Sequence, residues 1–230
     1  MRNQRILLLW RTPYRTMYED TVRSMGRSQG VQTKSRPKLN RDSVATAAIA
    51  LIERDGLETL TMRALADELR CGTMSLYSHV RNRDDLLESV VELLIRELDT
   101  VAQARETWQQ AIRRVLGSYR DLAVRHPRTF ELLALAPYDE LPVAPHLARV
   151  LCVLQGAGLN ADQASHVLAV ADAYATGFLV VWARSQATHR QDDLPTPWPM
   201  LSDLRHLDGF ERGLATLIAG LEATLGSTAG

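Results

Sequence analysis

From Asn40 onward, hydrophobic residues recur every three or four positions, which is the spacing of amphipathic helices. In the first such segment the apolar positions are Val44, Ala47, Ala48, Leu51 and Ile52. Gly56 follows as a residue that ends a helix, and Leu57 is placed to fold back on the last turn. The pattern therefore predicts a first helix that stops at Gly56.

Two short helices are expected next. Thr61 can cap a helix that ends near Arg70, and Gly72 permits a tight turn into the following helix. The apolar positions of the first are Met62, Leu65, Ala66 and Leu69. Those of the second are Leu76, Tyr77 and Val80.

A longer fourth helix is predicted to begin after Asn82. Asp84 and Asp85 lie in its first turn, where acidic side chains favour the positive end of a helix. Its apolar stripe consists of Leu86, Leu87, Val90, Val91, Leu94 and Leu98. The four helices, with no strand pattern between them, form one unit.

The remaining sequence also has helical periodicity. One apolar face runs from Trp108 to Leu122 and is interrupted at His126-Pro127. Further helices are predicted from the prolines at 142 and 145 through 154, from 160 or 161 to about 185, and over 208–225, with a loop at 189–199. The expected fold class is therefore all-α.

Composition supports a folded chain, since 46% of the 230 residues are hydrophobic. Cys71 and Cys152 stand far apart without a CxxC motif, so neither a disulfide framework nor a zinc site is indicated and a reducing cytoplasm is expected. Ile6 to Trp10 is too short for an export signal, and no stretch of about 18 apolar residues predicts a membrane span.

The net charge of the chain is zero, yet its basic residues are concentrated at the start. Residues 1–41 carry ten Lys or Arg against two acidic residues, a net charge of +8 that leaves −8 for the rest. We interpret residues 1–39 as a flexible basic arm that adds phosphate or minor-groove contacts. The alternative is an extension without function, because Met17 and Met25 are possible starts.

Two short helices joined by a turn are what a helix-turn-helix requires, because the second must project into the major groove of DNA. This spacing alone is weak, since short helix pairs are common. The segment LTMRALADELRCGTMSLYSHVRNRDDLL at 60–87 is more specific. It contains T-x-R-x-L-A at 61–66, L-Y-x-H-V at 76–80 and N-[KR]-x-x-L-L at 82–87, and it resembles the DNA-binding domain of the tetracycline repressor (TetR) family.

The resemblance implies a ligand-responsive repressor that binds operator DNA as a homodimer. It assigns DNA contacts to residues on the recognition helix and its flanks: Thr61, Arg63, Thr73, Met74, Ser75, Tyr77, Ser78, His79 and Arg83. Met74 suits a thymine methyl group, and Thr73 and Ser75 suit base edges or phosphate. The phosphate backbone is assigned to Thr61, Arg63, Tyr77, His79 and Arg83. Tyr77 could instead belong partly to the core, and His79 could cap its helix. Arg70-Cys71 departs from the Gly-Val pair common in the turn, and Arg70 could add a phosphate contact.

The regulatory half is expected to supply a dimer interface and a sensor. The apolar stripes of 162–185 and 208–225 are the predicted interface, as in the four-helix bundle of the family; the alternative is that both are core within one chain. The candidate ligand-binding residues are Trp108, Tyr119, His126, Phe130, His146, Gln155, His166, Asp172, Tyr174 and Phe178. For each, ordinary packing is the competing interpretation.

Some chemistry is not expected. The tetracycline-magnesium site of the family does not carry over, because Asp99 stands where the drug-binding repressors have a histidine and no second histidine lies near Phe130 to Ala136. No cofactor and no metal site is predicted. A helical enzyme using His126, His166 and Asp172 lacks any nucleophile or metal-ligand motif. An activator, an architectural factor or a partner-binding protein without DNA affinity remains a rival. The expected domains are the flexible basic arm at 1–39, the helix-turn-helix DNA-binding domain at 40–85 and the helical regulatory domain for ligand binding and dimerisation at 86–230.

Overall fold

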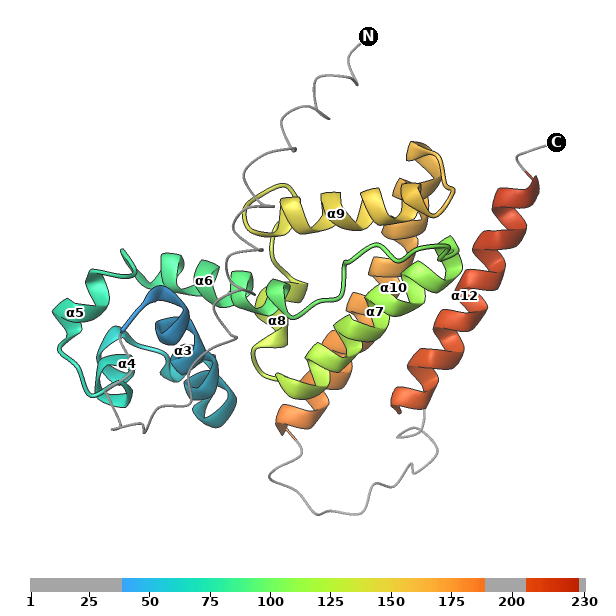
Figure 1. Ribbon diagram of the computed structural model, residues 1–230. Helices are drawn as coiled ribbons and strands as arrows, with labels where there is room; N and C mark the ends of the chain where they lie inside the picture. Colours follow the sequence, from blue (N-terminus) through green and yellow to red (C-terminus); the bar gives the residue numbers. More distant parts are fainter. Residues whose placement is uncertain (1–38, 189–205, 228–230) are drawn as a thin grey trace, which may run out of the picture. The chain divides into compact units, whose positions relative to one another are not determined.

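The computed structural model describes residues 39–188 and 206–227, and every regular element in these ranges is a helix (Figure 1). The predicted loop 189–199 and all of the predicted basic arm except Leu39 lie outside these ranges. The elements are α3 (Arg41–Asp55), η1 (Leu57–Thr59), α4 (Met62–Glu68), α5 (Thr73–Tyr77), α6 (Arg83–Arg96), α7 (Trp108–Arg125), α8 (Phe130–Ala134), α9 (Val143–Gly156), α10 (Ala161–Thr188) and α12 (Leu207–Ser227). The all-α fold is confirmed.

Side-chain caps set where several helices begin. The Asn40 side chain accepts a hydrogen bond from the Ser43 amide at 2.7 Å, and Ser43 Oγ accepts one from the Asn40 amide at 2.9 Å. Thr61 and Asn82 cap α4 and α6 as predicted, accepting from the amides of Ala64 and Asp85. Each cap satisfies an amide that has no partner within its helix.

The turn between α4 and α5 is closed by Arg70 rather than by Gly72. Arg70 has φ 51°, a left-handed conformation that side chains with a Cβ rarely adopt. Its amide donates to Asp67 at 3.1 Å and the next amide, of Cys71, donates to Ala66 at 3.0 Å, which completes a Schellman motif. Gly72 has φ −73° and is the N-cap of α5, so the prediction that it makes the turn was wrong.

α3, α4, α5 and α6 enclose one end of the core. Leu65 of α4 and Leu76 of α5 are fully buried, and Val80 is 1% exposed, so α5 is held on its inner side. α6 packs against α3 and also contacts α8 and α9. The predicted boundary at 85/86 falls in the first turn of α6, so this helix joins the helix-turn-helix to the rest of the described chain.

In the remaining part, α7, α8, α9 and α12 all contact the long helix α10 (Figure 1). Tyr174 of α10 stacks on Phe210 of α12 at 5.6 Å between ring centroids, and its hydroxyl donates to the Phe210 carbonyl at 2.9 Å. A Cβ added at Gly213 would lie 2.1 Å from that hydroxyl, so the close approach requires glycine there.

Most of the two stripes predicted to form a dimer interface are core within one chain. The buried members are Val167, Ala171, Ala175, Leu179, Phe210, Leu214, Ile218 and Leu221. The reason is that α10 packs on both α12 and α7. α10 is long and apolar enough to cross a membrane by length and composition, a test that core helices also pass; 33% of its most apolar stretch is buried.

Candidate nucleic-acid interface and sensor cavity

α5 presents an apolar and hydroxyl-bearing surface to solvent. Met74 is 80% exposed and Tyr77 is 47% exposed, and Ser75 and Ser78 are exposed beside them. Thr73 and His79 are partly buried. The exposure of Tyr77 argues against the alternative that this residue belongs to the core, because a core side chain is removed from water.

The inner end of α5 is fixed by a buried carboxylate. Asp85, 4% exposed, accepts hydrogen bonds from the Arg41 guanidinium at 2.7 Å and from the Arg81 amide at 2.7 Å. Arg41 also donates to the carbonyl of His79 at 3.3 Å. The hydrogen bond from Arg41 lowers the pKa of Asp85, and the amide of Arg81 lowers it further. Asp85, itself on α6, is therefore ionised at neutral pH and ties the segment that follows α5 to α3 through Arg41.

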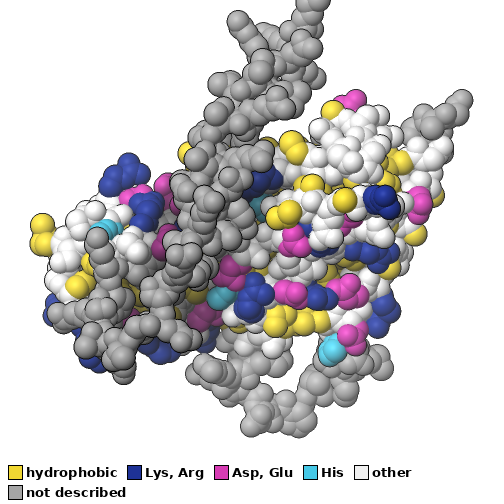
Figure 2. Space-filling model, viewed as in Figure 1, with side chains coloured by type: hydrophobic (Ala, Val, Ile, Leu, Met, Phe, Trp, Pro, Cys, Tyr) yellow, Lys and Arg dark blue, Asp and Glu magenta, His cyan; other side chains and the backbone are white. Residues whose placement is uncertain are grey.

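Arg63, Arg70, Arg81 and Arg83 are exposed around this surface. Figure 2 shows basic side chains around α4, α5 and the start of α6. Arg83 already donates to the carbonyls of Leu60 and Leu57, both at 3.3 Å, so it supports the η1 turn while keeping other donors free.

Arg81, whose side chain is 81% exposed, was not among the predicted DNA contacts. It stands between the end of the L-Y-x-H-V motif and the Asn82 cap, a position from which a side chain leaves the helix-turn-helix. Its position next to the motif could have identified Arg81 as a candidate DNA contact from the sequence. On the helical body basic side chains also lie beside acidic ones (Figure 2); Arg114, for example, pairs with Glu106 at 2.7 Å.

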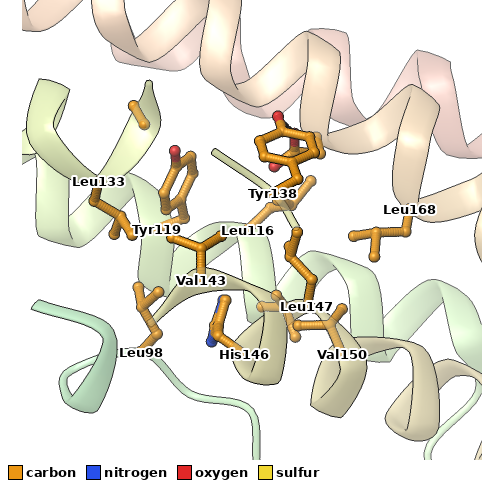
Figure 3. Close-up of a pocket in the computed structure, with 13 residues that line it drawn as sticks. Leu98, Leu116, Tyr119, Leu133, Tyr138, Val143, His146, Leu147, Val150 and Leu168 are labelled. Carbon is orange, nitrogen blue, oxygen red and sulfur yellow. Dashed lines mark hydrogen bonds between the residues drawn. The ribbon is translucent and has the colours of Figure 1, made fainter. Parts of the chain in front are cut away.

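A cavity of about 40 Å³ lies among α7, α8, α9 and α10 (Figure 3). It is lined by Leu98, Val115, Leu116, Tyr119, Leu133, Ala134, Tyr138, Val143, His146, Leu147, Val150, Leu168 and Asp172. A drug-sized ligand needs roughly 300 Å³ or more. The cavity in this conformation is therefore too small for such a ligand, and binding would require its walls to move.

Polar groups enter this apolar cavity at a few points. The Tyr138 hydroxyl donates to Oδ2 of Asp172, and the Tyr119 hydroxyl lies 3.3 Å from that of Thr176. Burial raises the pKa of Asp172 and raises the pKa of Tyr138 to about 12. His146 is 7% exposed and its Nδ1 has no hydrogen-bond partner; burial lowers its pKa to about 4, so its ring is neutral at pH 7.

Three of the ten predicted ligand residues, Tyr119, His146 and Asp172, thus line one cavity. Phe130 is buried behind it, 4.7 Å from the Tyr119 ring. The others lie elsewhere: Trp108 on a separate surface hollow, His126 near Glu97, Gln155 and His166 exposed, and Tyr174 and Phe178 packed on Phe210. The sequence missed Tyr138 because no periodic pattern marks a residue between helices.

The residues considered for metal chemistry have other roles. The Asp99 carboxylate pairs with Arg114 at 2.9 Å. Across residues 39–188 and 206–227, no three His, Cys, Asp or Glu side chains are grouped as metal ligands would be.

The chain is similar to known regulatory proteins. The sequence profile described as bacterial regulatory proteins, tetR family, matches residues 45–90. The class G tetracycline repressor protein of Vibrio anguillarum is 30% identical over 80% of this chain and 94% of its own length. An HTH-type transcriptional regulator of Saccharopolyspora erythraea is 27% identical over 85% and 89%.

A solved structure has the same arrangement of helices. ActR of Streptomyces coelicolor, a TetR family protein crystallised in complex with (S)-DNPA, is 28% identical with a TM-score of 0.61. The match covers 81% of this chain and 98% of that one. The similarity therefore includes the helix-turn-helix and the helices around the cavity.

Proposed function

The chain belongs to the tetR family of bacterial regulatory proteins, and on this premise we propose that it is a transcriptional repressor. It binds operator DNA as a homodimer, and a small-molecule inducer releases it. This function places the protein in the cytoplasm, where its DNA is, and requires no catalytic residue or cofactor.

The surface of α5 is the observation that carries the DNA-binding part. Met74 and Tyr77 are exposed although both are apolar, while Leu76 and Val80 between and after them are buried. A solvent-facing apolar side chain flanked by Ser75 suits thymine methyl groups and base edges in a major groove. The exposed Arg63 and Arg81 are placed to contact phosphates, which orient the protein on DNA.

DNA binding is tested with the purified full chain and the intergenic DNA upstream of its own gene, beside a scrambled duplex, at about physiological salt. We expect selective binding that Tyr77→Ala reduces by about tenfold or more. Arg63→Ala should weaken binding to both duplexes and reduce the slope of log affinity against log salt concentration by about one. Arg113→Ala, an exposed arginine on α7, is the matched control and should change neither.

Failure of a folded, dimeric chain to prefer its upstream DNA would reject the repressor function. It would leave a partner-binding protein that uses only the helical body.

The proposed dimer uses the outward side of α10 and α12. Ala169, Ala173 and Gly177 follow one another at intervals of four residues on α10 and are exposed in the single chain. Small side chains on one face let a second helix approach closely, and covering this apolar face removes it from water. A two-fold axis here would give two recognition helices for two half-sites.

Release by the inducer is proposed to act through α6. This helix contacts α3 in the helix-turn-helix and α8 and α9 beside the cavity. Since the cavity must expand to admit a ligand, α8 and α9 would move, and α6 would change the separation of the recognition helices. A ligand that binds free and DNA-bound dimer with equal affinity would contradict this mechanism.

A further inference from the structure

At one corner of the cavity, the carboxylate of Asp172 already accepts a hydrogen bond from a phenol of the same chain, that of Tyr138. Tyr138, labelled in Figure 3, lies in the segment between α8 and α9 and donates its hydroxyl hydrogen to Asp172 on α10. Within the part of the chain that the structure describes, this is the one side-chain hydrogen bond to Asp172. The contact shows which chemical group the corner accepts: an O–H donor carried by an aromatic ring.

Tyr138 is much more exposed to solvent than the cavity wall beside it. It is 53% exposed, whereas Leu133 and Val143 beside it are 5% and 4% exposed. A cavity of about 40 Å³ holds no aromatic ring, because an engineered cavity that binds benzene measures roughly 150 Å³. Outward movement of the Tyr138 ring would provide both the space and a free carboxylate.

The rest of the lining also favours an aromatic ligand with polar substituents. Leu116, Leu147 and Leu168 supply apolar surface for a ring. His146 is 7% exposed and presents its neutral ring, whose Nδ1 has no partner, to the same cavity from α9. A buried polar atom without a hydrogen bond is costly, and a second polar group on the ligand would satisfy it.

We propose that the inducer is a phenol-bearing aromatic molecule whose hydroxyl replaces that of Tyr138 on Asp172, so that Tyr138 is an internal competitor for its own ligand site. This rests on the proposed function only in taking the cavity as the sensor. The competition predicts opposite effects at the two residues: loss of the Asp172 charge weakens binding, and loss of the Tyr138 hydroxyl strengthens it.

The test measures calorimetric binding of 2-naphthol and 2-methoxynaphthalene to the full chain without DNA. The two probes share a ring system, but only 2-naphthol has an O–H donor. We expect 2-naphthol to bind at least about tenfold more tightly, as a hydrogen bond to a charged group implies. Asp172→Asn should remove this preference, and Tyr138→Phe should increase the affinity for 2-naphthol about threefold or more.

Asp162→Asn, at an exposed acidic residue in the first turn of the same helix, is the control and should leave both affinities unchanged. Circular dichroism establishes that each variant is folded; Tyr138→Phe keeps the ring and decides the question if Asp172→Asn does not fold. Equal affinities for the two probes, binding of neither, or weaker 2-naphthol binding by Tyr138→Phe would overturn the proposal. So would preferential binding of 1-naphthylmethylamine, which would assign the corner to a cation.

These outcomes do not depend on DNA. If the chain does not bind operator DNA selectively but prefers 2-naphthol, the repressor function is rejected and the phenol site is retained. If it binds operator DNA selectively but does not prefer 2-naphthol, the phenol site is rejected and the repressor function is retained.

Discussion

The Glu53 carboxylate accepts two hydrogen bonds from Thr129, one from its amide at 2.8 Å and one from its hydroxyl at 2.6 Å. The Arg128 amide donates to the same carboxylate at 3.2 Å. Glu53 lies on α3 in the helix-turn-helix unit, whereas Thr129 directly precedes α8, which lines the cavity. This contact joins the cavity wall to α3 independently of α6.

Replacing Thr129 by valine tests how firmly this contact holds. Thr129 is fully buried, and the variant keeps its shape while removing the donor to a charged group. The free energy of unfolding should fall by about 1.5–3 kcal/mol, measured by urea denaturation. Thr216→Val, at an exposed threonine on α12, should change it by less than about 0.5 kcal/mol. Equal effects of the two variants would show that the Glu53 contact contributes nothing.

Asp85 gives the fold a defined dependence on pH. Its folded-state pKa is lowered by Arg41, so its contribution is present above the unfolded pKa of about 3.9 and is lost as pH falls below about 5 towards the folded value. Asp85→Asn should cost about 2 kcal/mol at pH 7, less than a fully buried pair because the Arg41 side chain is 40% exposed.

The same variant should also flatten the loss of stability between pH 5 and pH 3. Asp84→Asn, at the exposed neighbour in the same helix turn, is the control and should keep the native slope. Urea denaturation across this pH range makes the comparison. An unchanged slope in Asp85→Asn would assign the acid sensitivity to other carboxylates.

Arg70 carries backbone strain that glycine would relieve. A left-handed residue with a Cβ costs about 1–2 kcal/mol, part of which glycine loses again through its greater freedom in the unfolded chain. Arg70→Gly should therefore stabilise the fold by up to about 1 kcal/mol, and Arg70→Ala, which keeps the strain, should not. Denaturation midpoints of the two variants check this. If Arg70 also contacts phosphate, both variants should weaken operator binding equally.

The elements that sequence predicts well are those specified by local chemistry. The caps at Thr61 and Asn82, the helix end at Gly56 and the break at His126-Pro127 each depend on residues within one or two turns, and the structure agrees with all four. The tight turn was predicted at Gly72 because glycine tolerates such turns, whereas the left-handed residue is Arg70, two residues earlier.

Contacts between distant segments were not predictable from periodicity. Glu53 and Thr129 are 76 residues apart, and neither belongs to a motif. The cavity combines Tyr119, Tyr138, His146 and Asp172 from four separate segments. Polar residues on apolar helix faces could be identified from the sequence, which gave three of the four but not Tyr138, the hydrogen-bond partner of Asp172. The short helix α8 was not predicted because its five residues make fewer than two helical turns, too few for a repeating apolar pattern, and it carries no motif like that of α5.

The oligomeric state provides the last prediction. Ala173 is the middle residue of the exposed small-residue face of α10, while its neighbours Ala171 and Ala175 are fully buried within the chain. Ala173→Arg should leave the fold intact, because the side chain starts at the surface, but would bury an unpaired charge in the proposed dimer. A cost of about 3 kcal/mol corresponds to a dissociation constant more than a hundredfold higher, measured by sedimentation equilibrium.

Ala50→Arg, exposed on α3, should leave the dimer unchanged. If Ala173→Arg remains dimeric at the same concentrations, the two copies meet through another surface, and the spacing of the recognition helices must be derived from that interface instead.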